Sequence, residues 1–322
     1  MKKRLIQLTQ PLLNRLGLRL RREKDDQRLQ DSNALLSEIV NHAREKATSG
    51  KHMGITFIVF SKDRALQLDG LLQSILHHVF GSYSIKVIYS TSSDSHRNAY
   101  NEVADRIKHS NRIEWTEEKD FRTNLIEALD AVETESVCFL VDDIVFIRPV
   151  HLDTISQQFK DAGILSLRLG RNITFCYTKQ KTMQKPGLSP AHDTNDLLQF
   201  SWEDGNYDWA YPLSVDGHIF PVSEIRIAAK RLDYHAPNSF ERALQILTPL
   251  YQKRPGFCFE SPRILNIPFN RVQNENNNIC GEVTPEELLN IWNDGGRLDY
   301  RALENIATTS VHTLTTLPLK KA

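Results

Sequence analysis

The stretch Phe139-Leu-Val-Asp-Asp-Ile-Val-Phe146 places two adjacent carboxylates where an apolar segment ends. The segment 137–141 is short and rich in large apolar side chains, which is typical of a strand buried inside a sheet. Two neighbouring like charges are costly to desolvate unless a cation neutralises them. A divalent cation with oxygen ligands, Mg²⁺ or Mn²⁺, is the usual solution and often bridges to substrate phosphates. The alternative, a pair of solvated turn carboxylates, is disfavoured by the apolar residues on both sides.

The chain before this stretch alternates apolar runs with segments of helical periodicity. The pattern predicts strands at 55–60, 85–90, 112–115 and 137–141, and helices at 66–79, 97–108 and 121–132. This order predicts an α/β fold with a mainly parallel sheet flanked by helices. In such sheets ligands bind at the carboxyl ends of the strands, which here are 61–64, 90–94, 115–118 and 142–143.

Well-known nucleotide-binding signatures are absent from these strand ends. The first strand is not followed by GxGxxG, and the chain contains no GxxxxGK[ST]. These absences disfavour a dinucleotide-dependent oxidoreductase and a P-loop NTPase. The glycine-rich opening of nucleotidylyltransferases is missing as well.

Residues 54–245 resemble the GT-A class of glycosyltransferases, which carry an acidic metal motif after the fourth strand of a Rossmann-like sheet. The similarity rests on Asp142-Asp143 and on the opening Phe57-Ile-Val-Phe-Ser-Lys-Asp-Arg64, followed by apolar residues at helical spacing. Many members have Asp-x-Asp where this chain has Val141-Asp142-Asp143. Asp143 is therefore the preferred metal ligand, and Asp142 serves the metal or the donor sugar.

The resemblance implies a nucleoside-diphosphate sugar as donor and a divalent cation, Mn²⁺ or Mg²⁺, held by Asp142 and Asp143. It also implies that Ser61, Arg64 and Ser90 contact the donor, with the first two beside its base or ribose. The alternative for the turn at 61–64 is that it only starts a helix, because Ser61 or Asp63 would be a good N-cap.

The second half of the chain is expected to bind the acceptor. Asp216 and His218 lie two residues apart on a predicted strand, so they would share a face and orient hydroxyl groups, or form a structural pair. In GT-A enzymes that invert the anomeric centre, a carboxylate near a helix start removes the acceptor proton. Glu241 is the best positional match for this catalytic base and Asp216 the second. The alternative for Glu241 is structural: it only completes a capping box at the start of its helix.

Aromatic residues gather just before this predicted strand. Trp202, Tyr207, Trp209 and Tyr211 are interleaved with carboxylates. Sugar clefts use such aromatic faces, but an aromatic stretch is more often part of a core. The tail after Thr308 is threonine-rich and is expected to be mobile.

The composition is that of an ordinary globular protein. The 322 residues include 40 Lys plus Arg against 40 Asp plus Glu, which argues against a protein that coats nucleic acid. Four scattered cysteines without CxxC spacing indicate a reducing compartment and no structural zinc site of that kind. No apolar run is long enough for a transmembrane helix.

Basic residues are concentrated at the N-terminus. Residues 1–50 hold eleven Lys or Arg against six Asp or Glu, and residues 1–22 hold no acid at all. We predict a basic amphipathic helical extension over 1–50, whose first 22 residues lie on an anionic membrane surface. The alternative is a helix that packs on the body or on a partner chain.

These observations predict three parts: the extension at 1–50, a nucleotide-sugar-binding half at 51–150, and an acceptor-binding half with a C-terminal helical tail at 151–322. The predicted function is metal-dependent, inverting transfer of a sugar to a glycan or lipid-linked acceptor. The expected location is cytoplasmic, peripheral on the inner face of the plasma membrane. Two alternatives stay open: a retaining transferase on the same scaffold, and a non-catalytic nucleotide- or glycan-binding protein.

Overall fold

The fold is described from a computed structural model of the chain. The structure describes residues 33–39, 41, 52–155, 163–191, 196–270, 272 and 279–321. The predicted membrane-binding helix at 1–22 lies outside these residues. Residues 33–39 are helical and lie within the predicted helical extension at 1–50.

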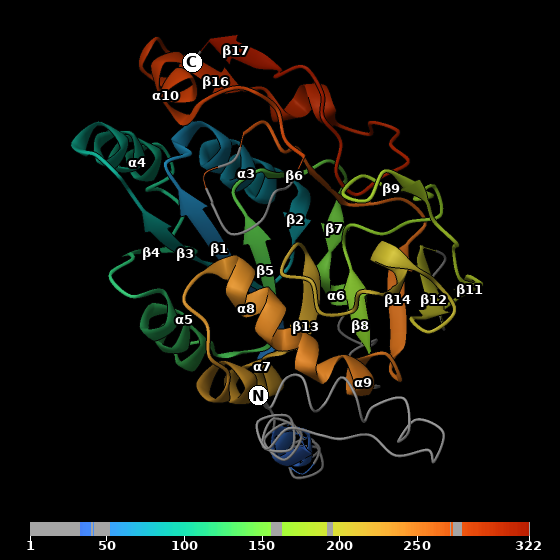
Figure 1. Cartoon of the computed structure of the whole chain (residues 1–322). Coiled ribbons are helices and arrows are strands. Elements are labelled where there is room, and N and C mark those ends of the chain that lie inside the picture. The colour runs from blue at the N-terminus through green and yellow to red at the C-terminus, as the bar shows by residue number, and fades with distance from the viewer. Residues whose placement is uncertain are drawn as a thin grey trace, which may run out of the picture.

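A nine-stranded sheet forms the centre of the molecule, in the order β11-β12-β14-β8-β13-β5-β1-β3-β4 (Figure 1). Its strands are β1 (His52–Lys62), β3 (Tyr83–Ser90), β4 (Ile113–Glu117), β5 (Thr134–Val141), β8 (Ile164–Ser166), β11 (Ser189–Pro190), β12 (Leu197–Ser201), β13 (His218–Pro221) and β14 (Pro255–Phe259).

The first half of the sheet is parallel, as the alternating pattern predicts. Strand β1 pairs in parallel with β3 on one side and with β5 on the other, and β3 pairs in parallel with β4. Phe60 lies opposite both Ile88 and Val141, so these three strands end at the same edge. That edge collects the residues that the sequence singles out.

The second half of the sheet is mixed. Strand β13 runs antiparallel between β5 and β8, and β14 runs parallel to β8. The strand expected at 215–220 begins only at His218, because Gly217 has a φ of 79°, which takes the backbone out of the extended region. Asp216 and His218 therefore do not share a strand face. Since β13 joins β5 to β8, one continuous sheet spans both predicted halves.

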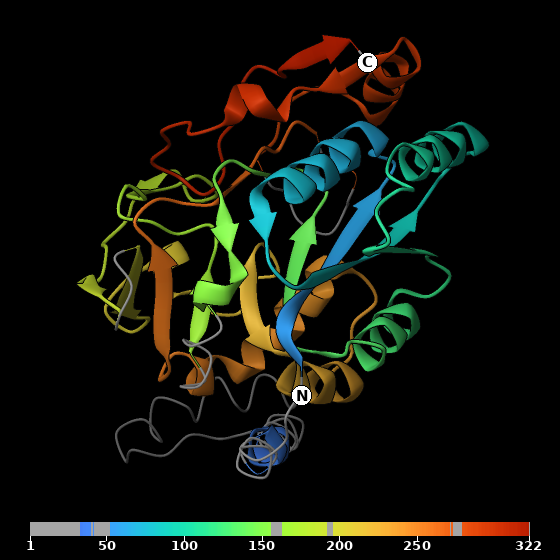
Figure 2. The ribbon, with the colours of Figure 1, turned by 180° about the vertical axis from the view of Figure 1, so that it is seen from behind.

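Helices cover both faces of the sheet (Figure 2). They are α3 (Ala65–His78), α4 (Asp94–Arg106), α5 (Phe121–Asp130), α6 (Leu152–Ile155), η2 (Tyr207–Ala210), α7 (Val222–Arg231), α8 (Pro237–Leu244), η3 (Gln245–Leu247), α9 (Thr248–Tyr251), α10 (Pro285–Asn293) and η4 (Tyr300–Leu303). One core packs apolar residues of α3 and α4 against the sheet, and the other packs α5, α7 and α8 against the opposite face. The predicted α/β architecture with helices flanking the sheet is confirmed, and antiparallel pairs make the second half of the sheet mixed.

Short two-stranded ladders join the peripheral segments. They pair β2 (Val79–Phe80) with β7 (Val150–His151), β6 (Ile144–Phe146) with β15 (Ile264–Asn266), β9 (Phe175–Cys176) with β10 (Lys181–Thr182), and β16 (Gly296–Leu298) with β17 (Leu319–Lys321).

The C-terminal segment, residues 279–321, lies along α3 (Figures 1 and 2). Helix α10 begins with the predicted Thr284 cap, whose hydroxyl accepts from the backbone N–H of Glu287. The expectation of a mobile tail after Thr308 is wrong, because its backbone is hydrogen-bonded into the body. Thr309 accepts from Thr174 and Phe175, and Val311 accepts from Asn266.

The aromatic stretch belongs to the core. Trp202 and Trp209 are fully buried, and both ring systems pack on Phe200. The core alternative for this stretch is therefore confirmed for these two residues.

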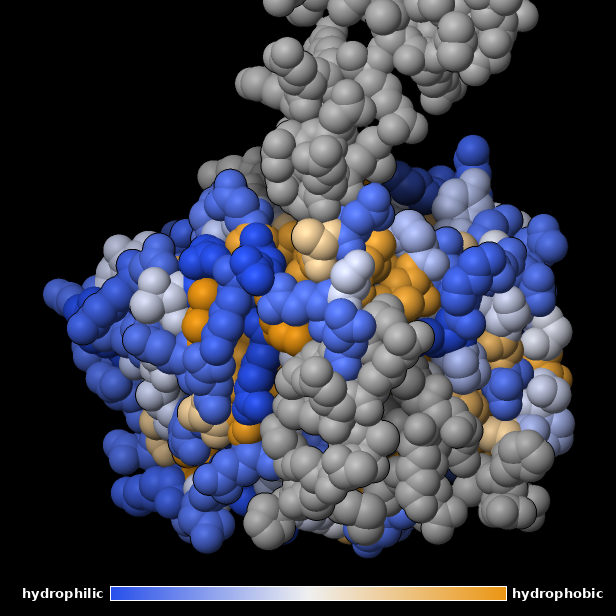
Figure 3. All heavy atoms as spheres, turned by 90° about the horizontal axis from the view of Figure 1, so that it is seen from below, coloured by the Kyte–Doolittle hydropathy of each residue, from blue (hydrophilic) through white to orange (hydrophobic). Residues whose placement is uncertain are grey.

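The face seen from below carries hydrophilic side chains around scattered apolar ones (Figure 3). The helical residues 33–39 contribute Leu35 and Ile39 to the core behind α5 and α7. Within the described ranges, no helix has the length and apolarity needed to cross a bilayer.

Candidate functional site

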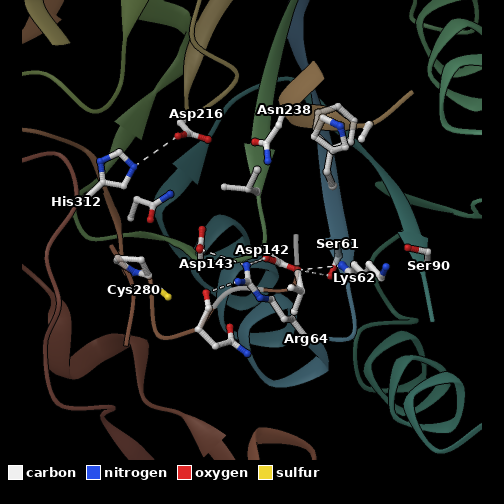
Figure 4. Close-up of a pocket in the computed structure, with 18 of the residues that line it drawn as sticks. Ser61, Lys62, Arg64, Ser90, Asp142, Asp143, Asp216, Asn238, Cys280 and His312 are labelled. Carbon is white, nitrogen blue, oxygen red and sulfur yellow. Dashed lines mark hydrogen bonds and ion pairs between the residues drawn. The ribbon is translucent and has the colours of Figure 1, made fainter. Parts of the chain in front are cut away.

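A pocket of about 470 Å³ opens at the edge where β1, β3 and β5 end (Figure 4). Its lining comes from six parts of the chain: the strand ends, residues 177–178, the segment before β13, the start of α8, residues between 266 and 272, and the C-terminal segment. The predicted residues Ser61, Arg64, Ser90, Asp142, Asp143 and Asp216 all line it. Glu241 is not among the lining residues.

Asp142 is held on all sides by the protein. Its Oδ2 accepts from the Ser61 hydroxyl at 2.8 Å and from the backbone N–H of Lys62 at 3.2 Å, and its Oδ1 accepts from Arg64 at 2.8 Å. The Tyr100 hydroxyl is 2.5 Å from the Ser61 hydroxyl. This network fixes the ends of β1 and β5 relative to each other, and both Asp142 oxygens have partners in it.

Arg64 is a buried cation that bridges two carboxylates and the C-terminal half of the chain. Its guanidinium reaches Asp142 at 2.8 Å and Asp143 at 3.3 Å, and it donates to the Asn270 carbonyl at 2.5 Å. Burial lowers the pKa of Arg64, but the two carboxylates outweigh burial and raise it above its ordinary value. Arg64 precedes α3 without a side-chain cap, and the Ser61 hydroxyl is used elsewhere, so the capping alternative for Ser61 is wrong.

Asp143 differs from Asp142 because only one of its two carboxylate oxygens is hydrogen-bonded among the described residues. Its Oδ1 is buried and has no hydrogen-bond partner among the described residues. Burial and the charges of Asp142 and Asp216 raise the pKa of Asp143 to about 6, although Arg64 and His312 act in the opposite direction. A buried carboxylate oxygen without a partner is costly, and a cation entering the pocket would satisfy it.

Asp216 lies on the other side of the pocket and is surrounded by cationic side chains. Its Oδ2 is 3.7 Å from His312 Nε2 and 3.6 Å from Arg168 Nη1. Burial by itself would raise the pKa of Asp216, but a hydrogen bond from His312 and the charge of Arg168 hold it below its usual range. Asp216 is therefore a carboxylate anion inside the pocket at neutral pH.

His218 is not part of the pocket lining. It is fully buried, and its Nδ1 is 3.0 Å from the Pro212 carbonyl. Burial is the main reason that the pKa of His218 falls to about 3, so the imidazole is neutral. His218 supports the region behind Asp216, and its predicted contact with substrate hydroxyls finds no support in this placement.

Glu241 lies on α8, behind the pocket wall. Its Oε1 accepts from the backbone N–H of Val215 at 3.2 Å, so it anchors the residue next to Asp216. Burial and the Asp216 charge raise the pKa of Glu241 to about 7. The capping alternative for Glu241 is wrong, because the Ser239 hydroxyl accepts from the backbone N–H groups of His235 and Ala236 at the helix start.

Sequence reasoning did not find the pocket residues of the C-terminal half. These include Tyr177, Asn238, Asn266, Cys280 and His312. His312 stacks on Tyr177 with ring centroids 6.3 Å apart. These five residues lie far apart in the chain, so no local spacing brings them together: Asn238 is in α8, Asn266 ends β15, and the other three are in irregular segments.

A comparison with known proteins finds similarity to a glycosyltransferase. The bifunctional glycosyltransferase pgtA of Dictyostelium discoideum is 25% identical over a match of 257 residues. The match covers 69% of this chain and 33% of that protein. The chain thus spans about a third of the length of this relative. The predicted resemblance to glycosyltransferases is confirmed by this match. No protein-family model matches the chain.

Several solved structures share part of the backbone arrangement. TarS 1-349 of S. aureus in complex with UDP is 13% identical, with a TM-score of 0.43 over 74% of this chain and 65% of that one. The mannosyltransferase PcManGT of Pyrobaculum calidifontis, in complex with GDP-Man and Mn²⁺, is 18% identical, with a TM-score of 0.29 over 44% of this chain and 47% of that one. Likeness at this level establishes neither a function nor a ligand for this chain.

Proposed function

We propose that the chain is a glycosyltransferase that moves a sugar from a nucleoside-diphosphate sugar to a glycan or lipid-linked acceptor. The observation that carries the proposal is the pocket at the ends of β1, β3 and β5, where Asp142 and Asp143 meet a buried arginine. The similarity to a known glycosyltransferase over 257 residues supports the same class.

The donor is proposed to lie over the strand ends. Ser61 and Ser90 are on the β1 and β3 side of the pocket, where they can contact the base or ribose. Arg64 lines the pocket, and its buried Nε has no hydrogen-bond partner among the described residues, so it can donate to a phosphate oxygen.

A divalent cation fits beside Asp143. The buried, unpartnered Oδ1 of Asp143 is an oxygen ligand of the kind that Mg²⁺ and Mn²⁺ prefer. Such an ion would neutralise the diphosphate and help it leave. Asp142 is proposed to act mainly by holding Arg64 and Ser61, because both its oxygens are already bonded.

Asp216 is our preferred base for an inverting reaction, ahead of Glu241. A general base must come within hydrogen-bond reach of the acceptor hydroxyl, so position is decided before pKa. Asp216 lines the pocket and is ionised, whereas Glu241 is bonded to the backbone of Val215 behind it. Glu241 is then a positioning residue for the segment that carries Asp216.

A binding protein without activity is the competing proposal, and a donor screen separates the two. Thermal unfolding is measured with nucleoside diphosphates and their sugars, with and without Mn²⁺, and donor hydrolysis is followed in parallel. A ligand at a hundred times its dissociation constant should add about 2.7 kcal/mol of stability. Stabilisation together with slow hydrolysis supports an enzyme, and stabilisation without any turnover supports the binder.

Asp143→Asn tests the cation site in the same assay. The variant should lose the Mn²⁺-dependent part of donor stabilisation and keep its fold, because the side chain emerges at a strand end. The matched control is Asp105→Asn, which changes an exposed carboxylate on α4. An Asp143→Asn protein with the Mn²⁺ dependence of the parent would contradict the assignment.

The two candidate bases are compared by Asp216→Asn and Glu241→Gln. Losing a general base typically costs about 10² to 10⁴ in rate. We expect a loss of this size in Asp216→Asn with donor binding kept, and a much smaller loss in Glu241→Gln. Collapse of transfer in Glu241→Gln alone would restore Glu241 as the base, and full activity in both would favour a retaining mechanism.

A further inference from the structure

The helix that follows the first strand ends in two adjacent histidines, and both face a glutamate of the C-terminal segment. His77 Nε2 and His78 Nε2 are each 3.5 Å from Glu304 Oε1. The three potential ligand atoms all lie within 4.8 Å of one another. The histidines occupy the last turn of α3, and Glu304 follows η4 directly.

Two atoms of this cluster are buried and lack hydrogen-bond partners. The His78 side chain is only 6% exposed, and within the described part of the chain neither His78 Nε2 nor Glu304 Oε1 has a hydrogen-bond partner. A charge-assisted hydrogen bond between these groups would bring the atoms to about 2.7–2.9 Å, well inside the distance found. Buried polar atoms almost always have a partner, so the cluster lacks one.

The spacing of the three atoms matches the edges of a metal tetrahedron. Zn²⁺ binds imidazole nitrogen and carboxylate oxygen at about 2.0–2.2 Å in tetrahedral geometry, which separates neighbouring ligand atoms by about 3.4 Å. The two nitrogen–oxygen separations of 3.5 Å are close to this value. We infer that His77, His78 and Glu304 form a Zn²⁺ site, with the fourth position left for water.

The surroundings suit neutral imidazole ligands. Burial, followed by the neighbouring His77, lowers the pKa of His78, which favours the form that binds metal. The Tyr300 ring lies beside both histidines, at 5.9 and 6.5 Å between ring centroids. The positive charge of Arg301 lies near the cluster and would repel a metal ion, and the carboxylate of Glu304 offsets this repulsion. His77 is 42% exposed, which gives the ion a path from solvent.

The ion would have a structural role that is independent of the proposed transferase activity. It would tie the C-terminal end of α3 to the segment that carries Cys280 and His312 into the pocket. The Asp143 site lies beyond the opposite end of α3, where Arg64 precedes the helix. The two cation sites can therefore be tested separately.

The test is zinc titration of the full chain, without an affinity tag and after removal of metals by chelation. To silence the pocket, all proteins carry Asp143→Asn and Cys280→Ser. We expect one Zn²⁺ per chain and a weakening of at least about 100-fold in His77→Ala and in Glu304→Gln, since even partners of ligands contribute about 10- to 100-fold. Co²⁺ in the same site should give the intense visible absorption of tetrahedral coordination.

His109→Ala is the matched control, because it removes an exposed imidazole beyond α4. The two test variants change partly exposed side chains, so they should fold, and circular dichroism checks this. Absence of saturable zinc binding by the parent would overturn the assignment. So would a zinc affinity in both test variants equal to that of the parent, or loss of zinc binding in His109→Ala.

Discussion

Arg64 illustrates how much one buried cation can hold together. It neutralises two carboxylates and bonds the Asn270 carbonyl, so its removal leaves Asp142 and Asp143 uncompensated. Removing one partner of a buried ion pair typically costs about 3–5 kcal/mol. We expect a loss of this size in Arg64→Ala, measured by chemical denaturation.

Two comparisons make this prediction specific. Adding Asp142→Asn to Arg64→Ala removes one of the stranded charges and should recover part of the loss. Arg97→Ala removes an exposed arginine whose guanidinium is 3.0 Å from Glu117. This variant should leave the midpoint of chemical denaturation almost unchanged. A loss in Arg64→Ala no larger than that in Arg97→Ala would mean that the buried network contributes little.

Glu241 should make stability depend on pH. Its pKa is raised from 4.5 to about 7 in the folded protein, mainly by burial, so the folded state binds a proton that the unfolded state has released. Stability from this group is therefore greatest below about pH 4.5 and falls as pH rises through 7. Glu241→Gln stays neutral, so it should gain stability relative to the parent over this window. Parallel stability curves for the two proteins would contradict the raised pKa.

At the scale of elements, the start of α8 connects helix capping to the pocket. The Ser239 hydroxyl accepts from the N–H groups of His235 and Ala236, and residues 235–238 line the pocket. Losing a cap typically costs about 0.5–2 kcal/mol. We predict that Ser239→Ala loses stability in this range and also binds substrate more weakly. Thr284→Ala removes the cap of α10 and should lose comparable stability with substrate affinity unchanged. Equal substrate affinities in Ser239→Ala and Thr284→Ala would mean that the start of α8 does not contribute to substrate binding.

The first strands and helices could be predicted from the sequence because each carries its own signal. The apolar run at 55–60 and the apolar spacing from Leu66 onward are local patterns, and both appear as β1 and α3. The positions of Ser61, Arg64 and Asp143 follow from the rule that parallel strands end at one edge. Cys280 and His312 could not be predicted in this way, because long-range packing of irregular backbone brings them to the pocket. The place of Glu241 behind the pocket wall could not be predicted either, because its carboxylate accepts from the backbone N–H of Val215, 26 residues away in the chain.

At the scale of the whole molecule, the basic extension predicts attachment to a surface. Residues 1–22 carry seven basic side chains and no acid. Each basic residue near an anionic membrane contributes roughly 1 kcal/mol, and salt weakens the attraction. Deleting residues 1–50 should therefore abolish binding to anionic vesicles, measured by sedimentation, while donor hydrolysis continues. The full chain with neutral vesicles is the control. Equal binding by the truncated protein would return the extension to a packing or partner role.

The antiparallel strand β13 has a consequence for how the chain acquires its shape during synthesis. Until residues 218–221 leave the ribosome, β5 has β1 on one side and an open edge on the other, along Val137 and Cys138. An open, apolar strand edge is a template for wrong pairing. Strands β8 and β14 can join the sheet only after β13, and His312 is added nearly a hundred residues later. A nascent chain of this protein should therefore need chaperone protection for its β5 edge until residues 218–221 have left the ribosome.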